Sequence, residues 1–188
     1  MPSDLALFLR QLARNPVQTS AVLPSSAYLA RAMVSELGPD SGRVVEFGPG
    51  TGVFTRAILN AGVRPQDLEL FEMNPDFAQH LRAAFPGVTV HVTGAQNIAH
   101  LCEAGVGTVI SGLPLLSMPT DLRRAIVGGA FTVLRKGGSM IQFTYGPKPP
   151  LDQTSFDLLG LTYVRKSKVW FNLPPATVYS FQRASGTP

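Results

Sequence analysis

The chain has 188 residues, of which 45% are hydrophobic and 15% charged, so it can build one sizeable core with fewer charges than a typical soluble domain. Cys102 is the only cysteine, which excludes an intrachain disulfide and a zinc site of several cysteines and fits a reducing compartment; with three scattered histidines, no metal centre is expected. The net charge of +4 favours an anionic partner, nucleic acid or an acidic membrane surface, and no run reaches the ~20 apolar residues of a membrane span.

The first 40 residues predict two helices. Residues 3–14, SDLALFLRQLAR, carry a stripe of leucines and a phenylalanine and set Arg10 and Arg14 one turn apart, which is typical of an amphipathic helix. This start lacks the basic segment and uninterrupted apolar core of a signal peptide. A second helix is expected over residues 25–37. We treat residues 1–40 as an N-terminal helical region.

From residue 43 onward, strand and helix patterns alternate. Buried strands are predicted at residues 43–47, 67–74, 88–94, 107–112 and 139–145. Helices are predicted between them at about 52–60, 75–85, 97–103 and 121–135. Two final runs, near 161–172 and 177–183, are rich in Val, Tyr and Phe and predict a hairpin. The pattern indicates an α/β domain over residues 41–188, with a mostly parallel sheet, helices on both faces and an antiparallel strand at the edge.

The turn after the first strand reads EFGPGTG and predicts a ligand site. Such a turn lies at the switch point of a parallel sheet, where ligands bind. Gly48 and Gly50 permit a backbone path that residues with a Cβ avoid, and Gly52 is expected to let the next helix begin close to the ligand. The spacing G-x-G-x-G differs from the G-x-G-x-x-G of dinucleotide sites. Glu46, expected to point its carboxylate into the crevice, would repel a pyrophosphate and suits a cationic ligand.

The ends of the next two strands predict the rest of this site. Glu72 lies about 20 residues beyond the turn, where an acid can accept hydrogen bonds from both ribose hydroxyls. Met73, beside it, is placed to lie on an adenine face. Ala95 and Gln96 follow the third strand, where an adenine edge would lie, and the Gln96 amide can both donate and accept hydrogen bonds.

These motifs resemble the class I S-adenosylmethionine-dependent methyltransferases, from about Val44 to Arg183. The resemblance implies a Rossmann-like fold with a seven-stranded sheet, extra N-terminal helices, S-adenosylmethionine as cofactor and S-adenosylhomocysteine as product. The implied cofactor-binding residues are Glu46, Gly48, Gly50, Thr51, Gly52, Glu72, Met73, Ala95, Gln96 and Ser111.

The turn after the fourth strand, SGLPLL, bears on the methyl acceptor. Methyltransferases that act on base amines carry [ND]-P-P-[YF] or N-L-P-[YF] there, and EFGPGTG also resembles the turn of the rRNA adenine dimethyltransferases. In this chain the turn begins with Ser111 and Gly112 and carries no Asn, and Leu115 replaces the aromatic residue that would stack on the base. Because of these departures, nucleic-acid adenine-N6 methylation is kept as the alternative function and not as the first one. A small-molecule methyltransferase and a protein that binds cofactor or lipid without turnover are further alternatives.

Taken whole, the sequence resembles the bacterial phospholipid N-methyltransferases, which methylate phosphatidylethanolamine in one to three steps toward phosphatidylcholine. The segments that carry this resemblance are NPVQTSAVLPSS (15–26), VVEFGPGTGVFT (44–55), SGLPLLSMP (111–119), IQFTYGPKPP (141–150) and VWFNLPPATVY (169–179). The resemblance implies that the N-terminal helix binds an anionic membrane and, with the second helix, forms a lid over the substrate. It also implies a cytoplasmic monomer attached peripherally to the inner membrane, with no nucleic-acid partner.

Methylation of a lipid amine assigns roles to residues near the predicted acceptor. A primary amine resembles lysine, with a pKa of about 10, and must lose a proton before it attacks the methyl group. The carbonyls of Ser111 and Gly112 are predicted to orient the amine, and Tyr145 to hydrogen-bond the amine or the headgroup phosphate. The predicted substrate-binding residues are Tyr28, Leu113, Pro114 and Tyr145, with Leu115 and Leu116 adding to an apolar turn, while Trp170 is expected in the core.

Overall fold

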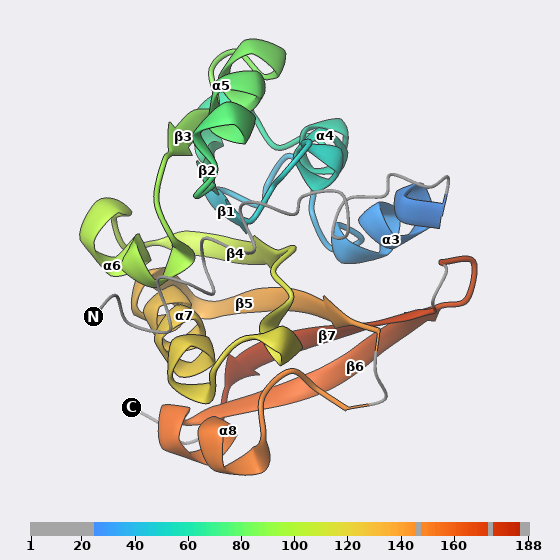
Figure 1. Ribbon diagram of the computed structural model, residues 1–188, viewed down its shortest axis with the longest axis vertical. Helices are drawn as coiled ribbons and strands as arrows, with labels where there is room; N and C mark the ends of the chain where they lie inside the picture. Colours follow the sequence, from blue (N-terminus) through green and yellow to red (C-terminus); the bar gives the residue numbers. More distant parts are fainter. Residues whose placement is uncertain (1–24, 146–147, 173–174, 185–188) are drawn as a thin grey trace.

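The computed structural model describes residues 25–145, 148–172 and 175–184 (Figure 1). Its helices and strands are α3 (Ser25–Met33), β1 (Val44–Phe47), α4 (Val53–Asn60), β2 (Leu68–Phe71), α5 (Pro75–Ala84), β3 (Thr89–His91), α6 (Ile98–Leu101), β4 (Val106–Ser111), α7 (Thr120–Val133), β5 (Leu134–Thr144), α8 (Gln153–Leu159), β6 (Leu161–Val169) and β7 (Ala176–Arg183). The helix predicted over residues 3–14 lies outside the described residues.

The strands form one seven-stranded sheet in the order β3-β2-β1-β4-β5-β7-β6. The pairs among β1 to β5 are parallel, while β7 runs antiparallel to both β5 and β6. The predicted α/β fold with a mostly parallel sheet and an antiparallel hairpin at one side is therefore confirmed. Because β7 inserts between β5 and β6, the edge strand on that side is β6.

Helix α3 ends at Met33 rather than at the predicted residue 37, and two further elements differ from the sequence prediction. Helix α8 was not predicted, because only a short apolar run separates the proline-rich loop from β6. Its cap signal is nevertheless present: the Asp152 carboxylate accepts a hydrogen bond from the Ser155 backbone N–H at 2.8 Å, and Gly160 ends the helix at a φ of 62°. Strand β5 begins at Leu134 rather than at residue 139, and it passes through the predicted glycine turn at Gly137.

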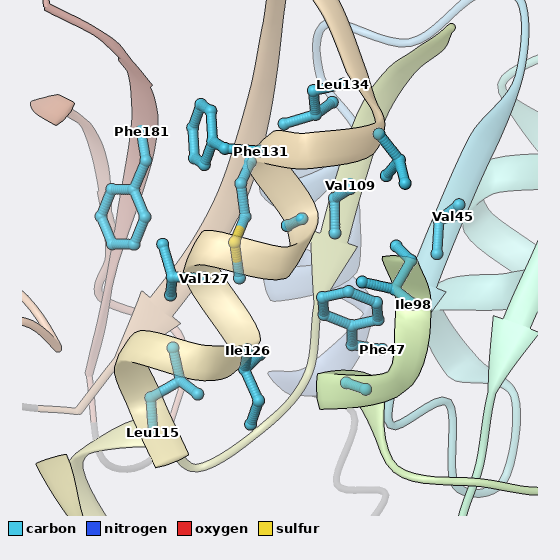
Figure 2. Close-up of a cluster of buried hydrophobic side chains, with 14 of the residues drawn as sticks. Val45, Phe47, Ile98, Val109, Leu115, Ile126, Val127, Phe131, Leu134 and Phe181 are labelled. Carbon is cyan, nitrogen blue, oxygen red and sulfur yellow. The ribbon is translucent and has the colours of Figure 1, made fainter. Parts of the chain in front are cut away.

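Helices cover both faces of the sheet (Figure 1). On one face α3, α4 and α5 pack on a core whose members include Leu29, Ile58, Leu81, Ile110 and Val178. On the other face α6, α7 and α8 pack on a second core, part of which Figure 2 shows: Val45, Phe47, Ile98, Val109, Leu115, Ile126, Val127, Phe131, Leu134 and Phe181. Since side chains alternate along a strand, Val45 and Phe47 enter the second core, while Val44 and Glu46 face α3, α4 and α5.

Helix α3 packs directly on the sheet. Its Leu29 and Met33 are buried in the same core as Ile58 of α4 and Val169 at the end of β6. The division into residues 1–40 and 41–188 stays a prediction, since residues 1–24 are outside the described part of the chain.

The carboxyl ends of the parallel strands lie at one edge of the sheet. Phe47 pairs with Phe71 on one side and with Ser111 on the other, and Ser111 pairs with Gln142. The glycine turn after β1, Glu72 after β2 and the loop after β4 all follow this row of paired residues. The topology therefore brings together three of the segments that the sequence predicts to bind cofactor.

Candidate active site

The glycines of the turn after β1 are required by backbone conformation and, at two positions, by close packing. Gly48, Gly50 and Gly52 all have positive φ angles, of 65°, 54° and 84°. A Cβ at Gly48 would lie 2.7 Å from the Leu113 side chain, and one at Gly52 would lie 2.5 Å from the Phe85 ring. Gly52 is thus required by packing against α5 and its flank, rather than by the ligand approach that the sequence suggested. A Cβ at Gly50 would meet no atom of the described residues within 4 Å, so this position faces open space.

Glu72 joins the end of β2 to the glycine turn. Its Oε2 accepts a hydrogen bond from the Gly50 backbone N–H at 3.1 Å, and its Oε1 accepts one from the Asn74 N–H at 2.8 Å. Each carboxylate oxygen has two acceptor positions, so both oxygens retain capacity for a further donor. The exposed side chain of Met73 lies next to it in the chain. The structure thus places Glu72 against the turn, as its predicted role with ribose requires, and that role itself stays a prediction.

Glu46 lies inside the molecule and not on the open side of the turn. Its side chain has no exposed surface; Oε2 accepts a 2.7 Å hydrogen bond from the Thr55 hydroxyl of α4, and Oε1 has no partner among the described residues. The expectation of a carboxylate pointing into the crevice is corrected, because strand alternation turns Glu46 toward α4. The pKa of Glu46 is raised to about 8, chiefly by burial and in smaller part by the Glu72 charge, while the hydrogen bonds with Thr55 oppose the shift. Near pH 7 the Glu46 side chain is therefore mainly the neutral acid. The expectation that its negative charge repels a pyrophosphate does not apply to this protonation state.

The raised pKa of Glu46 predicts a pH dependence of stability. The unfolded chain releases this proton above pH 4.5, whereas the folded protein holds it up to about pH 8. The contribution of Glu46 to the free energy of unfolding is therefore most favourable below pH 4.5, falls as pH rises to 8 and is level above that. Glu46→Gln removes this titration and is expected to gain stability over the parent protein, on the order of 3 kcal/mol at pH 7. Urea unfolding of both proteins at pH 4.5, 7 and 8 measures the difference; parallel pH profiles would contradict it.

The segment after β3 contains Ala95 and Gln96, the two residues predicted to lie at the adenine edge. Ala95 is buried in the core and begins a short 3-10 turn, Ala95–Asn97. Gln96 is half-buried, and its amide lies over Gly94, where a Cβ would come within 2.3 Å of Oε1. Gly94 is thus required for this position of the Gln96 side chain. The predicted contact of Ala95 and Gln96 with adenine stays a prediction.

The loop after β4 is held from both sides. The buried Ser111 hydroxyl accepts a hydrogen bond from the Leu113 N–H at 3.4 Å, and the Gly112 N–H donates to the Phe47 carbonyl at 2.8 Å. Gln142 of β5 donates from Nε2 to the Leu113 carbonyl at 2.9 Å. Sequence reasoning missed Gln142, although an amide inside the apolar run SMIQF was a signal that it supports a neighbouring loop.

The apolar turn that follows is only partly available to a substrate. Leu113 and Pro114 are half-buried and Leu116 is exposed, but Leu115 is 1% exposed and belongs to the core (Figure 2). Leu115 is therefore removed from the predicted lipid-facing turn, because η3 (Leu115–Ser117) turns its side chain toward α7.

The two tyrosines proposed for the acceptor lie farther out along the same edge. Tyr145 directly follows β5, is exposed, and contacts Phe143 edge to face at 5.3 Å between ring centroids. It lies three residues beyond Gln142, the partner of Ser111, and so about 10 Å past that level along the strand. Tyr28 of α3 is also exposed, and its ring lies 5.6 Å from the Phe171 ring. The catalytic and substrate roles of both residues stay predictions.

The described residues offer hydrogen-bond acceptors and backbone groups at this edge, but no metal-binding cluster. No group of three His, Cys, Asp or Glu side chains in residues 25–145, 148–172 and 175–184 is arranged to hold a metal ion. Glu72, the open side of Gly50 and the partly exposed Gly48 and Thr51 form one surface beside the loop that begins at Gly112. This arrangement suits a ligand that donates hydrogen bonds to a carboxylate.

Comparison with known proteins defines the class. No protein-family model matches the chain. The ornithine lipid N-methyltransferase of Singulisphaera acidiphila is 31% identical over 188 residues, with 94% of each chain covered. The ribosomal RNA small subunit methyltransferase A of Maridesulfovibrio salexigens is 37% identical over 70 residues, which are 37% of this chain and 26% of that protein.

Two solved structures share the fold over nearly the whole chain. The 1,6-didemethyltoxoflavin-N1-methyltransferase of Burkholderia thailandensis, solved with bound S-adenosylhomocysteine, covers 97% of this chain and 91% of its own, with a TM-score of 0.71 and 15% identity. The match to the TehB-like S-adenosylmethionine-dependent methyltransferase of Corynebacterium glutamicum covers 97% of this chain and 100% of that one, with a TM-score of 0.63 and 12% identity.

The sheet order, the glycine turn after β1 and the acid after β2 together define a class I S-adenosylmethionine-dependent methyltransferase, and S-adenosylmethionine is its cofactor. Both points confirm the sequence prediction. Within this class, the chain belongs to the family of the Singulisphaera acidiphila ornithine lipid N-methyltransferase, to which it is similar over 94% of its length.

Proposed function

We propose that this methyltransferase transfers methyl groups from S-adenosylmethionine to the primary amine of a membrane lipid. The observation that carries the proposal is the 31% identity, over 94% of both chains, to an enzyme named for N-methylation of ornithine lipid. Phosphatidylethanolamine is the acceptor that the sequence resemblance implies, and ornithine lipid is the acceptor in the relative's name. Both lipids present a primary amine at the membrane surface, so they are the two acceptors to compare.

The residues at the carboxyl edge suit this reaction. S-adenosylmethionine supplies a methyl group on a positively charged sulfur; the amine nitrogen bonds to that carbon while the carbon–sulfur bond breaks and its electron pair stays on sulfur. We assign Glu72 to the ribose hydroxyls and the open side of Gly50 to the approach of the cofactor. The loop from Ser111 to Pro114 positions the amine, which releases its proton to solvent. Alignment and exclusion of water supply roughly 7–11 kcal/mol in such reactions, so a dedicated strong base is not required.

An rRNA adenine methyltransferase is the second candidate. The 70-residue match to the ribosomal RNA enzyme and the net charge of +4 favour it. Two observations count against it: the match covers only 26% of that protein, and Leu115, at the position of the base-stacking aromatic, is buried in the core.

A methyl-transfer assay with four acceptors tests the proposal. The protein is incubated with radiolabelled S-adenosylmethionine and vesicles of phosphatidylethanolamine, of ornithine lipid or of phosphatidylcholine, or with ribosomal RNA. We expect label in one or both lipids that carry a primary amine and none in phosphatidylcholine, whose nitrogen is already fully substituted. Label confined to RNA would establish the second candidate instead. Glu72→Ala is the control for label that does not depend on the cofactor site.

Membrane attachment through residues 1–14 is the second part of the proposal. No helix among the described residues is long and apolar enough to cross a bilayer. From the resemblance of the sequence to the phospholipid N-methyltransferases, we propose a cytoplasmic monomer bound peripherally to the inner membrane. An amphipathic helix with arginines on its polar side binds anionic surfaces. Deletion of residues 1–14 is therefore expected to lower co-sedimentation with phosphatidylglycerol vesicles, and equal sedimentation of both proteins would contradict this role.

A further inference from the structure

Large aromatic side chains are exposed where β6 ends. Trp170 and Phe171, which directly follow the last residue of β6, are 66% and 78% exposed. Tyr28 of α3 is 53% exposed and lies 5.6 Å from the Phe171 ring. We call Tyr28, Trp170 and Phe171 the aromatic tip; in Figure 1 this end of the hairpin lies beside α3. The expectation that Trp170 enters the core is wrong, because β6 is the edge strand and the chain leaves the sheet after Val169.

The base of the aromatic tip is firmly packed. Val169 pairs with Ala176, and both are buried in the core that contains Leu29 and Met33 of α3. A rigid base with three large exposed aromatic side chains is an unusual surface for a protein that stays in water, and such patches mark interaction sites. Tyrosine and tryptophan in particular prefer the interface between apolar and aqueous regions.

The charge around the aromatic tip is positive. Residues 161–172 contain Arg165, Lys166 and Lys168 and no acid. The Lys168 Nζ lies 3.7 Å from the centroid of the Trp170 ring, and Lys166 forms an ion pair with Glu36 at 2.6 Å. Lysines beside exposed aromatic rings can hold their charge in the headgroup region while the rings enter the apolar layer.

The aromatic tip extends past the same edge of the sheet as the active site. Thr177 of β7 pairs with Thr144 at the carboxyl end of β5, and Ala176 pairs with Val169. Trp170 and Phe171, which follow Val169, therefore lie beyond the carboxyl ends of the parallel strands, on the side of Glu72 and of the loop after β4. A bilayer at the tip would face the edge at which methyl transfer is proposed.

We propose that the aromatic tip inserts into the interface of an anionic bilayer, as a second membrane contact besides residues 1–14. The occupant is a lipid surface because exposed aromatic rings occur there together with more cations than acids: Arg165, Lys166 and Lys168 against Glu36, the ion-pair partner of Lys166. The proposal goes beyond the lipid acceptor of the proposed function, and its test measures binding without any methyl transfer. A second copy of the chain, or the chain's own residues 1–24, would be the competing occupants.

Trp170 is the only tryptophan in the chain, so tryptophan fluorescence, excited at a wavelength that tyrosine does not absorb, reports on the tip alone. We expect water-like emission that acrylamide quenches in the free protein, and a blue shift with phosphatidylglycerol vesicles. Lipids brominated near the top of the acyl chain should then quench the emission. Sedimentation with vesicles while the emission is unchanged would overturn the proposal and leave binding to residues 1–14. Blue-shifted, acrylamide-protected emission without vesicles would also overturn it, because another protein segment or copy would then cover the tip.

Two variants separate this contact from general apolar adhesion. Phe171→Ala is expected to lower the vesicle partition coefficient about tenfold, since it removes one inserted aromatic ring. Leu158→Ala is the matched control: Leu158 is 68% exposed but lies on α8, next to the amino end of β6 and so at the opposite edge. Equal partition of the two variants would overturn the proposal. Thermal unfolding of both variants, with values near that of the parent protein, shows that binding and not folding has changed.

Discussion

Glu72→Ala is expected to weaken the binding of S-adenosylhomocysteine about 100-fold, as measured by isothermal titration calorimetry. Hydrogen bonds to a charged group contribute about 1.5–3 kcal/mol each, and a ribose offers two hydroxyls to one carboxylate. The substitution also removes the acceptor of the Gly50 and Asn74 backbone N–H groups, which loosens the turn that faces the cofactor. The effect is therefore larger than the loss of a single ligand contact.

Two further variants sharpen the Glu72 prediction. Glu72→Gln keeps one acceptor oxygen and the shape of the side chain, so we expect about a tenfold loss of affinity. Glu103→Ala removes an exposed carboxylate from the end of the segment after α6 and is expected to leave the affinity unchanged. Near-normal affinity of Glu72→Ala, with an unfolding temperature like that of the parent protein, would refute the ribose assignment.

Gly52→Ala is expected to destabilise the fold by about 3 kcal/mol, whereas Gly50→Ala costs about 1 kcal/mol. Both residues have positive φ, so both substitutions carry the strain of a left-handed residue. At Gly52 the new methyl group would also lie 2.5 Å and 2.8 Å from two atoms of the Phe85 ring. Phe85 is itself buried in the core, so its ring has little room to move away. Urea unfolding of the two variants measures this difference.

Gly50→Ala, which is expected to cost less stability than Gly52→Ala, is expected to cause the larger direct loss of cofactor affinity. The methyl group of Gly50→Ala would project into the open space beside the Glu72 hydrogen bond, where we place the cofactor. We therefore expect Gly50→Ala to remain folded and to lose S-adenosylhomocysteine binding at least tenfold. If Gly50→Ala bound the cofactor as tightly as the parent protein, the open side of Gly50 would not belong to the site. If Gly52→Ala were as stable as the parent, packing against α5 would not explain that glycine.

Local sequence patterns were sufficient for most of the fold. The alternation of buried strands with amphipathic helices from residue 43 onward depends on periodicity and on turn residues, which act within a few neighbours. The same applies to the glycine turn and to the acid after β2. Helix α8 was missed because its signal is a single cap, Asp152 with Ser155, on a helix too short to show a clear period.

The environments of individual side chains could not be predicted in this way. Leu115 was expected on an exposed apolar turn but is buried in the core, whereas Trp170 was expected in the core but is exposed at the edge of the sheet. Gln142 supports the acceptor loop from a strand 29 residues away in sequence. Such contacts depend on which strands are neighbours, and the insertion of β7 between β5 and β6 is a property of the assembled sheet.

The sequence by itself determined the class of fold, the cofactor and the positions of the turn and of Glu72, because the G-x-G-x-G spacing and the strand-end acid are local features of the chain. Only the tertiary structure decided that Glu46 is buried with a raised pKa and that Gly52 packs on Phe85 while Gly50 faces open space. It also decided that Trp170 and Phe171 are exposed at the edge of the sheet where the candidate active site lies. The physical reason is that burial, desolvation and steric contact arise from residues distant in sequence, which meet only when the sheet and its covering helices have formed.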